Sequence, residues 1–329
     1  MRRDQRIFFP SLGLPEGDGS WQIEVHAWCF RLRARRFVIP IVRKALGFKH
    51  VRLTATEQQR FAERARWMFV DNKRGRSIVV DIDGRIYALG QTQANGHLRA
   101  QITVSLPPGR VAHECVVAPV WRDISGTDPI DIHFLAAEGL SIISDIDDTI
   151  RVSHVADRAA LLRGTFVEPF AAVPRMAELY VAWARCGAQF HYVSATPWQL
   201  YVPIATFLDA SGFPKGTFHL KDFRWRDRTF FNLFASADRY KRSHIESLLK
   251  RLPRRRFVLV GDSGQRDPEV FGDLCRRYPQ QVRLIFVRDL TGSARISRYR
   301  AAFAGIDRRV WKVFTDPATL PTSLTDASI

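Results

Sequence analysis

The stretch Leu140-Ser-Ile-Ile-Ser-Asp145-Ile-Asp147-Asp148-Thr149 starts as an apolar strand and ends in a cluster of carboxylates. Unpaired like charges at neighbouring positions raise each other's pKa, whereas a divalent cation with oxygen ligands stabilises them all as anions. Asp145 and Asp147 are two positions apart on a nearly extended segment, so a slight bend lets both side chains approach one centre. The stretch therefore predicts a buried strand whose C-terminal end carries an acidic, cation-binding site.

A second apolar strand also ends in carboxylates. It is Arg256-Phe-Val-Leu-Val-Gly261-Asp262, followed by Ser-Gly-Gln-Arg-Asp267-Pro268. We expect Asp262 to complete an all-oxygen Mg²⁺ site with Asp145 and Asp147, and Asp267 to bind the metal or orient its waters. In the alternative interpretation, Asp267 caps the N-terminus of a helix that begins with Pro268.

A third strand-like run leads into a helical pattern at His191-Tyr-Val-Ser194-Ala-Thr196-Pro197-Trp198. The Ser194 hydroxyl and nearby backbone amides are suited to hold phosphate oxygens. Thr196 stands before a proline and is predicted to cap the following helix, which leaves Ser194 free to face the site.

A cation is needed to offset the charge between a carboxylate nucleophile and a phosphate. Lys241 opens a predicted helix with an apolar stripe over residues 245–252, and this helix leads back to the strand at 256. In βαβ units such a helix begins at the sheet edge where the C-terminal ends of the strands meet, so Lys241 is the favoured active-site lysine. Lys221, in His219-Leu-Lys-Asp222, is the competing choice.

These residues together favour phosphoester hydrolysis in two steps. Asp145 would attack phosphorus to form an aspartyl phosphate, while Asp147 protonates the leaving oxygen and later takes a proton from the attacking water. Ser194 and Lys241 complete the predicted catalytic set.

The sequence pattern changes near Gly139: before it, short strand and turn signals alternate, and after it, apolar blocks are separated by long helical patterns. Residues 1–138 are predicted to form an N-terminal, β-sandwich-like domain, and residues 139–329 an α/β domain with a doubly wound parallel sheet. In the second domain, strands are expected at 140–146, 189–194, 256–261 and 282–287. Helices are expected at 173–186, 197–210, 241–252 and 268–277.

The N-terminal domain shows two different patterns. Residues 21–30 alternate as a strand with one buried face, and residues 77–136 show strand, turn and strand signals, which predicts a small antiparallel sandwich. Between them, Thr54-Ala-Thr-Glu57 is a capping box, and Phe61, Ala65 and Met68 form one apolar stripe behind it. A basic helical insert is therefore expected within the sandwich.

The chain is strongly basic. Its formal net charge is +17, from 50 Lys or Arg and 33 Asp or Glu, which favours polyanions such as nucleic acid or anionic lipid surfaces. Residues 31–76 contain 14 basic and three acidic residues. Within them, cations flank the apolar run Phe37–Val42, as in a segment that anchors a protein to an anionic membrane. The alternative is that this run is a sandwich strand and that the helical insert has a solvated basic face.

No apolar run approaches the roughly 20 residues of a bilayer-spanning helix, and the first residues lack the pattern of a secretory signal. The four cysteines form no C-x-x-C pair and are predicted to be free core thiols in a reducing compartment. We therefore expect a cytoplasmic protein with peripheral attachment to membranes and without an obligate protein partner.

The motifs D-I-D-D-T, V-S-A-T-P-W and G-D-S-G-Q-R-D-P, together with Lys241, resemble those of the haloacid-dehalogenase superfamily of phosphohydrolases. More closely, residues 139–290 resemble the catalytic domain of the actin-patch-type phosphatidate phosphatases, which are relatives of the lipins. The chain departs from this pattern at Ala195-Thr196, where the family more often has Asn-Ser. The resemblance implies a haloacid-dehalogenase-like sheet and Mg²⁺-dependent conversion of phosphatidate to diacylglycerol, with Asp145 and Asp147 in the two catalytic positions.

The spacing of the motifs bears on the substrate. The gaps between Asp145 and Ser194 and between Ser194 and Lys241 are too short for a large separate cap domain, which predicts an open site suited to a phosphate on a membrane or a macromolecule. Residues 218–234 mix aromatic and basic side chains, as expected at a lipid interface, on single-stranded nucleic acid, or in a hairpin that packs on its own domain.

Three functions therefore remain: a lipid phosphate phosphatase, a phosphatase for polynucleotides or other soluble phosphoesters, and a silent binding module. The family resemblance favours the first. The third is disfavoured because a binding module has no need for Asp147 in addition to phosphate-holding groups.

Overall fold

The computed structural model describes residues 4–17, 19–32, 40, 43–44, 51–82, 84–105, 115–117, 130–222, 237–291 and 296–324. The chain forms two compact units. The first comprises residues 1–37, 66–137 and 216–218, and the second comprises residues 38–65, 138–215 and 219–329. The boundary between the two units at Glu138 lies next to Gly139, where the sequence pattern changes.

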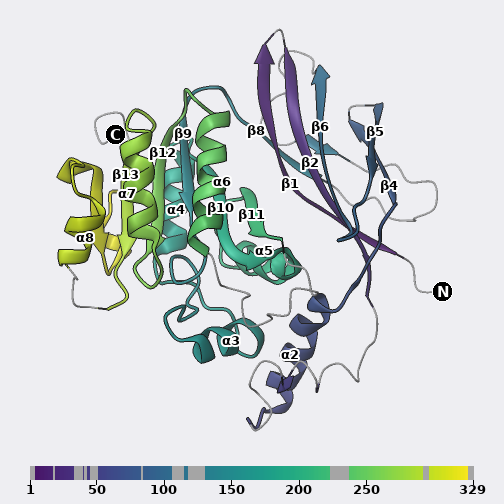
Figure 1. The fold of residues 1–329 in the computed structure, drawn as a ribbon, viewed down its shortest axis with the longest axis horizontal. Helices are drawn as coiled ribbons and strands as arrows, with labels where there is room; N and C mark the ends of the chain where they lie inside the picture. Colours follow the sequence, from purple (N-terminus) through teal and green to yellow (C-terminus); the bar gives the residue numbers. More distant parts are fainter. Residues whose placement is uncertain are drawn as a thin grey trace. The chain divides into compact units, whose positions relative to one another are not determined.

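The first unit is built from β-strands (Figure 1). One sheet has the order β3-β2-β1-β8-β7 with β6 also paired to β2, and a second sheet consists of β4 and β5. The bounds are β1 Gln5–Gly17, β2 Ser20–Arg31, β3 Asp71–Asn72, β4 Ser77–Ile82, β5 Arg85–Gln91, β6 His97–Ser105, β7 Cys115–Val117 and β8 Ile130–Phe134.

Alternating side chains of both sheets form one apolar core. Ile23, Val25 and Ala27 of β2 are buried in the same cluster as Ile78 and Val80 of β4, as the alternation of apolar residues dictates for a sheet with one buried face. The expected sandwich-like packing is thus present. The prediction of a purely antiparallel arrangement is wrong in one place, because β1 pairs with β8 in parallel.

Helix α2, Ala55–Met68, begins with the predicted capping box. The Thr54 amide donates to the Glu57 carboxylate at 2.8 Å, and the Glu57 amide donates to the Thr54 hydroxyl at 3.3 Å. Residues 55–65 of this helix belong to the second unit, although the sequence pattern placed them within the N-terminal domain.

The second unit contains a six-stranded sheet of order β11-β10-β9-β12-β13-β14. The strands are β9 Leu140–Ser144, β10 Gln189–Pro197, β11 Thr217–Lys221, β12 Arg256–Asp262, β13 Val282–Arg288 and β14 Trp311–Phe314. The helices are α3 Arg158–Phe166, α4 Met176–Arg185, α5 Tyr201–Ala210, α6 Ala237–Arg251, α7 Asp267–Arg277 and α8 Ile296–Ala302, with short 3₁₀ turns at 198–200, 308–310 and 317–319.

This sheet has the strand order of doubly wound α/β folds. Strands β9, β10, β12, β13 and β14 pair in parallel, and β9 and β12 are buried along nearly their whole length, as expected for a sheet covered on both faces. In Figure 1 helices α6 and α7 lie in front of the sheet and α4 behind it. The strand order reverses between β9 and β12, and in such folds ligands bind at the C-terminal ends of the strands beside that point.

The four strands and four helices predicted for this unit are confirmed, with ends shifted by a few residues. Helix α3, the edge strands β11 and β14, and helix α8 were not predicted. These elements are short, and short elements carry too few residues for a hydrophobic period to be recognised.

Among the described residues, no helix combines the length and the apolar character needed to cross a membrane. Cys29 and Cys275 are free and buried as predicted, whereas Cys186 is free but exposed, so its assignment to the core is wrong. Most of the apolar run Phe37–Val42 and residues 223–234 of the aromatic and basic segment lie outside the described residues.

Candidate active site

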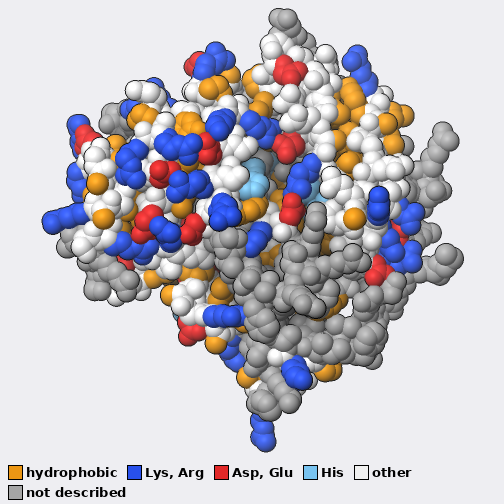
Figure 2. Space-filling view, viewed as in Figure 1, with side chains coloured by type: hydrophobic (Ala, Val, Ile, Leu, Met, Phe, Trp, Pro, Cys, Tyr) orange, Lys and Arg blue, Asp and Glu red, His pale blue; other side chains and the backbone are white. Residues whose placement is uncertain are grey.

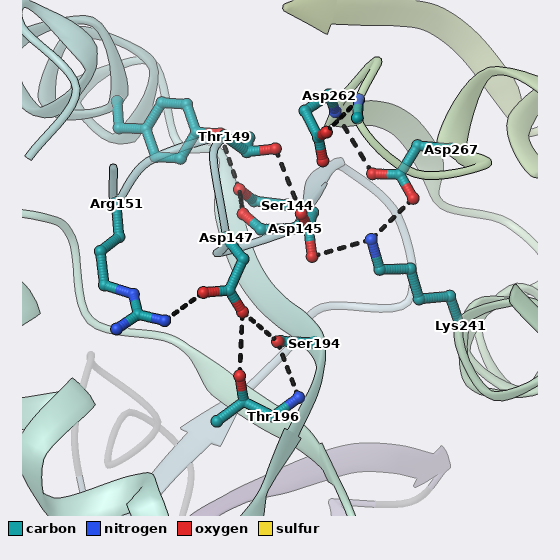
Figure 3. Close-up of polar contacts among 12 residues, drawn as sticks. Ser144, Asp145, Asp147, Thr149, Arg151, Ser194, Thr196, Lys241, Asp262 and Asp267 are labelled. Atoms are coloured by element: carbon teal, nitrogen blue, oxygen red, sulfur yellow. Dashed lines mark hydrogen bonds and ion pairs between the residues drawn. The ribbon is translucent and has the colours of Figure 1, made fainter. Parts of the chain in front are cut away.

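The C-terminal ends of three neighbouring strands bring the predicted site residues together (Figure 3). Asp145 follows β9 directly, Ser194 lies near the end of β10, and Asp262 is the last residue of β12. The register of the parallel pairs aligns these ends, since Ser144 is the partner of Tyr192 on one side and of Val260 on the other. The sheet thus collects residues that are far apart in the sequence.

Asp145 shares a lysine with Asp267. The ammonium group of Lys241 lies 3.0 Å from Asp145 Oδ1 and donates a hydrogen bond of 2.7 Å to Asp267 Oδ1. All three side chains are buried. Lys241 lies in the first half of α6, as the sequence argument placed it, whereas the competing Lys221 ends β11, two strands away from β9.

Burial and the neighbouring charges both shift the pKa values of Asp145 and Lys241. Burial raises the pKa of Asp145, and the nearby carboxylates raise it further, while Lys241 opposes both effects. The pKa of Lys241 is raised above its usual value because the charges of Asp145, Asp267 and Asp262 outweigh the desolvation of its ammonium group. The lysine is therefore a permanent cation in the site.

Three carboxylates at this sheet edge fit a divalent cation. Oxygen atoms of Asp145, Asp262 and Asp267 all lie within 4.8 Å of one another. Asp262 Oδ1 accepts a hydrogen bond from the Gly264 amide at 2.6 Å, but its buried Oδ2 has no hydrogen-bond partner among the described residues. Such an orphaned oxygen is unfavourable unless a cation or water satisfies it, and an all-oxygen donor set suits Mg²⁺.

The approach of Asp267 to β12 depends on the glycine at position 261. A Cβ atom on Gly261 would lie 2.4 Å from Asp267 Oδ2 and 2.7 Å from the ring of Phe271. Because Gly261 has no side chain, Asp267 can lie against the strand and accept a hydrogen bond of 3.3 Å from the Asp262 amide.

Asp147 points away from the lysine toward a separate set of donors (Figure 3). Arg151 forms a buried ion pair with Oδ1, and the hydroxyls of Ser194 and Thr196 donate to Oδ2 at 3.0 and 2.9 Å. Burial opposes ionisation of Asp147, but Arg151 and the two hydroxyls outweigh it, so the pKa of this carboxyl is lowered. Asp147 is therefore held as a carboxylate.

Two helix-cap interpretations are wrong. Thr196 lies within β10, its hydroxyl binds Asp147, and the following 3₁₀ turn has Pro197 at its N-cap without a side-chain bond. Asp267 is the first residue of α7 rather than its cap, and its carboxylate accepts from Lys241 and from the Asp262 amide. In both cases a buried charge nearby is a stronger partner than the free amides of a helix end.

The sequence argument missed Arg151 and Asp148. Arg151 stands four positions after Asp147, and a cation that closely follows a run of carboxylates is the signal that could have found it. Asp148 has a positive φ of 56°, and its carboxylate accepts the amides of Ser153, His154 and Val155 at 2.8, 2.9 and 2.6 Å. This turn folds residues 149–155 back so that Arg151 reaches Asp147.

Residues 140–289, which contain all six predicted site residues, match the family model described as "Phosphatidate phosphatase APP1, catalytic domain". This part of the chain is similar to that family. The resemblance inferred from the motifs is thereby confirmed. Arg151, Asp148 and Thr196 also lie within the residues that match the phosphatidate phosphatase APP1 catalytic domain, whereas helix α2 precedes them.

Two curated proteins are similar to the chain. Phosphatidate phosphatase APP1 of Saccharomyces cerevisiae is 30% identical over 212 residues, which are 62% of this chain and 35% of that protein. An uncharacterized protein of Schizosaccharomyces pombe is 27% identical over 164 residues, which are 49% of this chain and 27% of that protein. The chain thus spans between about a quarter and a third of the length of these relatives.

Among solved structures, a flavohemoglobin from Malassezia yamatoensis aligns with 94% of this chain and 60% of that chain, at 9% identity and a TM-score of 0.16. A score this low does not indicate a shared fold.

Proposed function

We propose that this chain is a Mg²⁺-dependent phosphatidate phosphatase, with a haloacid-dehalogenase-like catalytic unit that converts a lipid phosphomonoester to diacylglycerol and phosphate. The family match supports the substrate class. The observation that carries the chemistry is the buried ion pair of Asp145 with Lys241 at the end of β9, with a second, differently held carboxylate at Asp147.

Asp145 is the proposed nucleophile. In the first step a bond forms between its carboxylate oxygen and phosphorus, and the bond between phosphorus and the lipid oxygen breaks. Lys241 would favour the anionic form of the nucleophile against the effect of burial and would offset the charge of the incoming phosphate, because its ammonium group lies 3.0 Å from Asp145 Oδ1 in a buried site. Water then attacks the aspartyl phosphate, which releases phosphate and restores Asp145.

Asp147 is the proposed general acid and base. Asp147 lies two residues after Asp145 and has hydrogen-bond partners of its own. These features suit a carboxyl group that exchanges protons without binding phosphorus itself. To protonate the leaving lipid oxygen, Asp147 would first have to take up a proton from solvent, which the negative charge of a bound phosphate would favour by raising its pKa. Once it is a carboxylate again, it would take a proton from the attacking water. Ser194, which donates to Asp147 Oδ2 at 3.0 Å, would also contact phosphate oxygens.

Asp145, Asp262 and Asp267 are the proposed ligands of Mg²⁺. When bound, the cation would offset the charge of the carboxylates and of the substrate phosphate. Asp147 was also expected to bind this Mg²⁺. Its role as a metal ligand stays a prediction, because its two oxygens already bind Arg151, Ser194 and Thr196.

The substrate would be reached at an anionic membrane surface in the cytoplasm. The face in Figure 2 mixes positive and negative side chains. Ion pairs such as those of Arg277 and Lys250 with Glu246 also balance basic residues of the second unit. Mixed charge of this kind gives little net attraction to lipid. The unbalanced basic residues of the stretch 31–76 are therefore the better candidate for membrane attachment.

The decisive experiment measures phosphate release with Mg²⁺ from phosphatidate vesicles, lysophosphatidate, a 3′-phosphorylated oligonucleotide and an aryl phosphate. The Asp145→Asn variant, which lacks the proposed nucleophile, serves as the negative control. Preference for the lipids supports the proposal, whereas preference for the oligonucleotide moves the assignment to a polynucleotide phosphatase. No release from any substrate would leave only the binding-module hypothesis.

A further inference from the structure

We propose that Arg151 is a positioning residue for Asp147, and that Arg64 of α2 keeps Arg151 in place through the ring of Phe170. The proposal deepens the phosphatase function proposed above and rests on it. It extends the catalytic machinery to a helix that precedes residues 140–289, the part matched by the catalytic-domain family.

Arg151 is almost completely enclosed. Its side chain is 1% exposed and pairs with Asp147 Oδ1, and its guanidinium carbon lies 4.4 Å from the ring centroid of Phe170. Its Nε atom has no hydrogen-bond partner among the described residues. With Nε unbonded, the carboxylate of Asp147 and the ring of Phe170 are the contacts that orient the guanidinium.

Phe170 is held beside Arg151 by backbone pairing. The Val152 amide donates to Ala171 O at 2.8 Å, and the Val173 amide donates to Ile150 O at 2.9 Å. These bonds bring the segment that carries Phe170 alongside the turn that carries Arg151. The backbone thus fixes where the ring is attached, but not which way the ring is turned.

Arg64 contacts the same ring from helix α2. Its guanidinium carbon lies 3.6 Å from the centroid of Phe170, and its Nη1 donates to the carbonyls of Thr165 and Glu168 at 2.9 and 2.7 Å. These carbonyls lie at the C-terminal end of α3, where carbonyl groups lack intrahelical partners and a cation is favoured. Arg64 is thereby tied to fixed acceptors and presents a planar face to Phe170.

The four side chains form a continuous series from Arg64 to Phe170, Arg151 and Asp147. Loss of the Arg64 plane would let the ring of Phe170 turn into the vacated space, and Arg151 would lose its stacking partner. The Asp147 carboxylate would then occupy more than one orientation. A general acid must lie within hydrogen-bond reach of the leaving oxygen, and a shift of about 1 Å can lower a rate about 100-fold.

The test uses the dependence of kcat/KM on the leaving group. The phenolate released from 4-nitrophenyl phosphate leaves without a proton, whereas that from phenyl phosphate benefits from an acid. Because kcat/KM reports the steps up to departure of the leaving group, later hydrolysis of the phosphoenzyme does not affect the comparison. A variant that misplaces Asp147 should lose activity on phenyl phosphate and retain much of it on 4-nitrophenyl phosphate.

We expect Arg151→Met to lower kcat/KM about 100-fold on phenyl phosphate and about 10-fold or less on 4-nitrophenyl phosphate. Phe170→Leu and Arg64→Met should show the same selective loss at about 10-fold on phenyl phosphate. Arg151→Lys keeps the charge and should restore part of the loss. Arg60→Met is the matched control: Arg60 lies on the same helix and donates to Val167 O at 2.7 Å at the same end of α3, so its variant should show no selective loss.

Thermal unfolding of each variant separates loss of fold from loss of position. Equal losses on the two substrates in Arg64→Met and Phe170→Leu, or a selective loss in Arg60→Met as large as theirs, would overturn the proposal while leaving the phosphatase function intact. If Arg151→Met does not fold, Arg151→Lys and Phe170→Leu decide the result. A wild-type protein without activity on any phosphomonoester would overturn the function and this inference together.

Discussion

The ammonium group of Lys241 lies 3.0 Å from Asp145 and 2.7 Å from Asp267, and all three groups are buried. One lysine therefore balances two carboxylates, of which one directly follows β9 and the other is the first residue of α7. A third carboxylate, Asp262, also raises the pKa of this lysine. The stability of this part of the fold and its affinity for a cation are linked through Lys241.

Substitution Lys241→Met should destabilise the protein more than it would at an ordinary buried position. Removing one partner of a buried ion pair typically lowers the free energy of unfolding by about 3–5 kcal/mol, because the other charge stays buried without compensation. Mg²⁺ should recover part of this loss in the variant. Urea denaturation with and without Mg²⁺ measures both effects, and a variant as stable as the wild type without Mg²⁺ would contradict the arrangement.

Substitution Asp145→Asn should abolish turnover on every substrate, since the amide cannot form the phosphoenzyme. The wild-type protein, quenched in acid during turnover of a ³²P-labelled substrate, should retain label that the variant lacks. Near-normal rates in Asp145→Asn would show that another residue is the nucleophile.

Mg²⁺ binding should weaken as the pH falls. Burial, together with the charge of Asp267, raises the pKa of Asp262 to about 7 in the metal-free protein, so protons and Mg²⁺ compete for this carboxylate near neutral pH. A raised pKa means that the protonated form dominates below about pH 7, where the apparent affinity for Mg²⁺ should decline. Calorimetric titration at several pH values tests this, and Asp262→Asn should bind weakly at all of them. Activity that survives exhaustive chelation would argue against the site.

Arg255→Met should lower stability without changing the activity of the folded fraction. Arg255 donates to Glu138 O at 2.6 Å, to Leu140 O at 2.7 Å and to the Ser141 hydroxyl at 2.9 Å, and so fixes the start of β9. Loss of these bonds in a buried setting should lower the free energy of unfolding by about 2–4 kcal/mol. Arg254→Met, at the neighbouring exposed position, is the control and should behave as wild type.

Charge reversal of Arg33, Arg35 and Arg36 should weaken co-sedimentation with phosphatidate-containing vesicles, and added salt should have the same effect on the wild type. Arg31 is left unchanged because it pairs with Asp4. Hydrolysis of a soluble aryl phosphate should be unaffected. An equal loss on the soluble substrate would assign these residues to folding instead.

The positions of the catalytic strands could be predicted from the sequence because each combines a continuous apolar run with a polar end. The run from 141 to 144 and the run from 257 to 260 are buried as expected, and the carboxylates that follow them meet because parallel strands end at one edge. Lys241 could be placed by the same reasoning, since the helix that returns to β12 begins at that edge.

The partners of Asp147 could not be derived from spacing alone. Thr196 and Asp267 each directly precede a proline, a pattern that favours helix caps. In the folded chain their side chains instead bind buried charged groups, which other strands and helices bring close. Arg64 was predicted only as part of a basic helix, because its three carbonyl acceptors lie in the last turn of α3 or just after it, and the sequence pattern did not reveal α3.

The turn at Asp148 has a consequence for the thermodynamics of ligand binding. Its carboxylate ties down three successive amides, so residues 149–155 are ordered by the chain itself. Ordering a flexible loop on binding would consume part of the intrinsic affinity as lost conformational entropy, roughly 1–2 kcal/mol for each residue fixed. Here that entropy is already lost when the protein folds. If a phosphate binds beside Asp145 as proposed, binding would therefore not carry the entropic cost of ordering this segment.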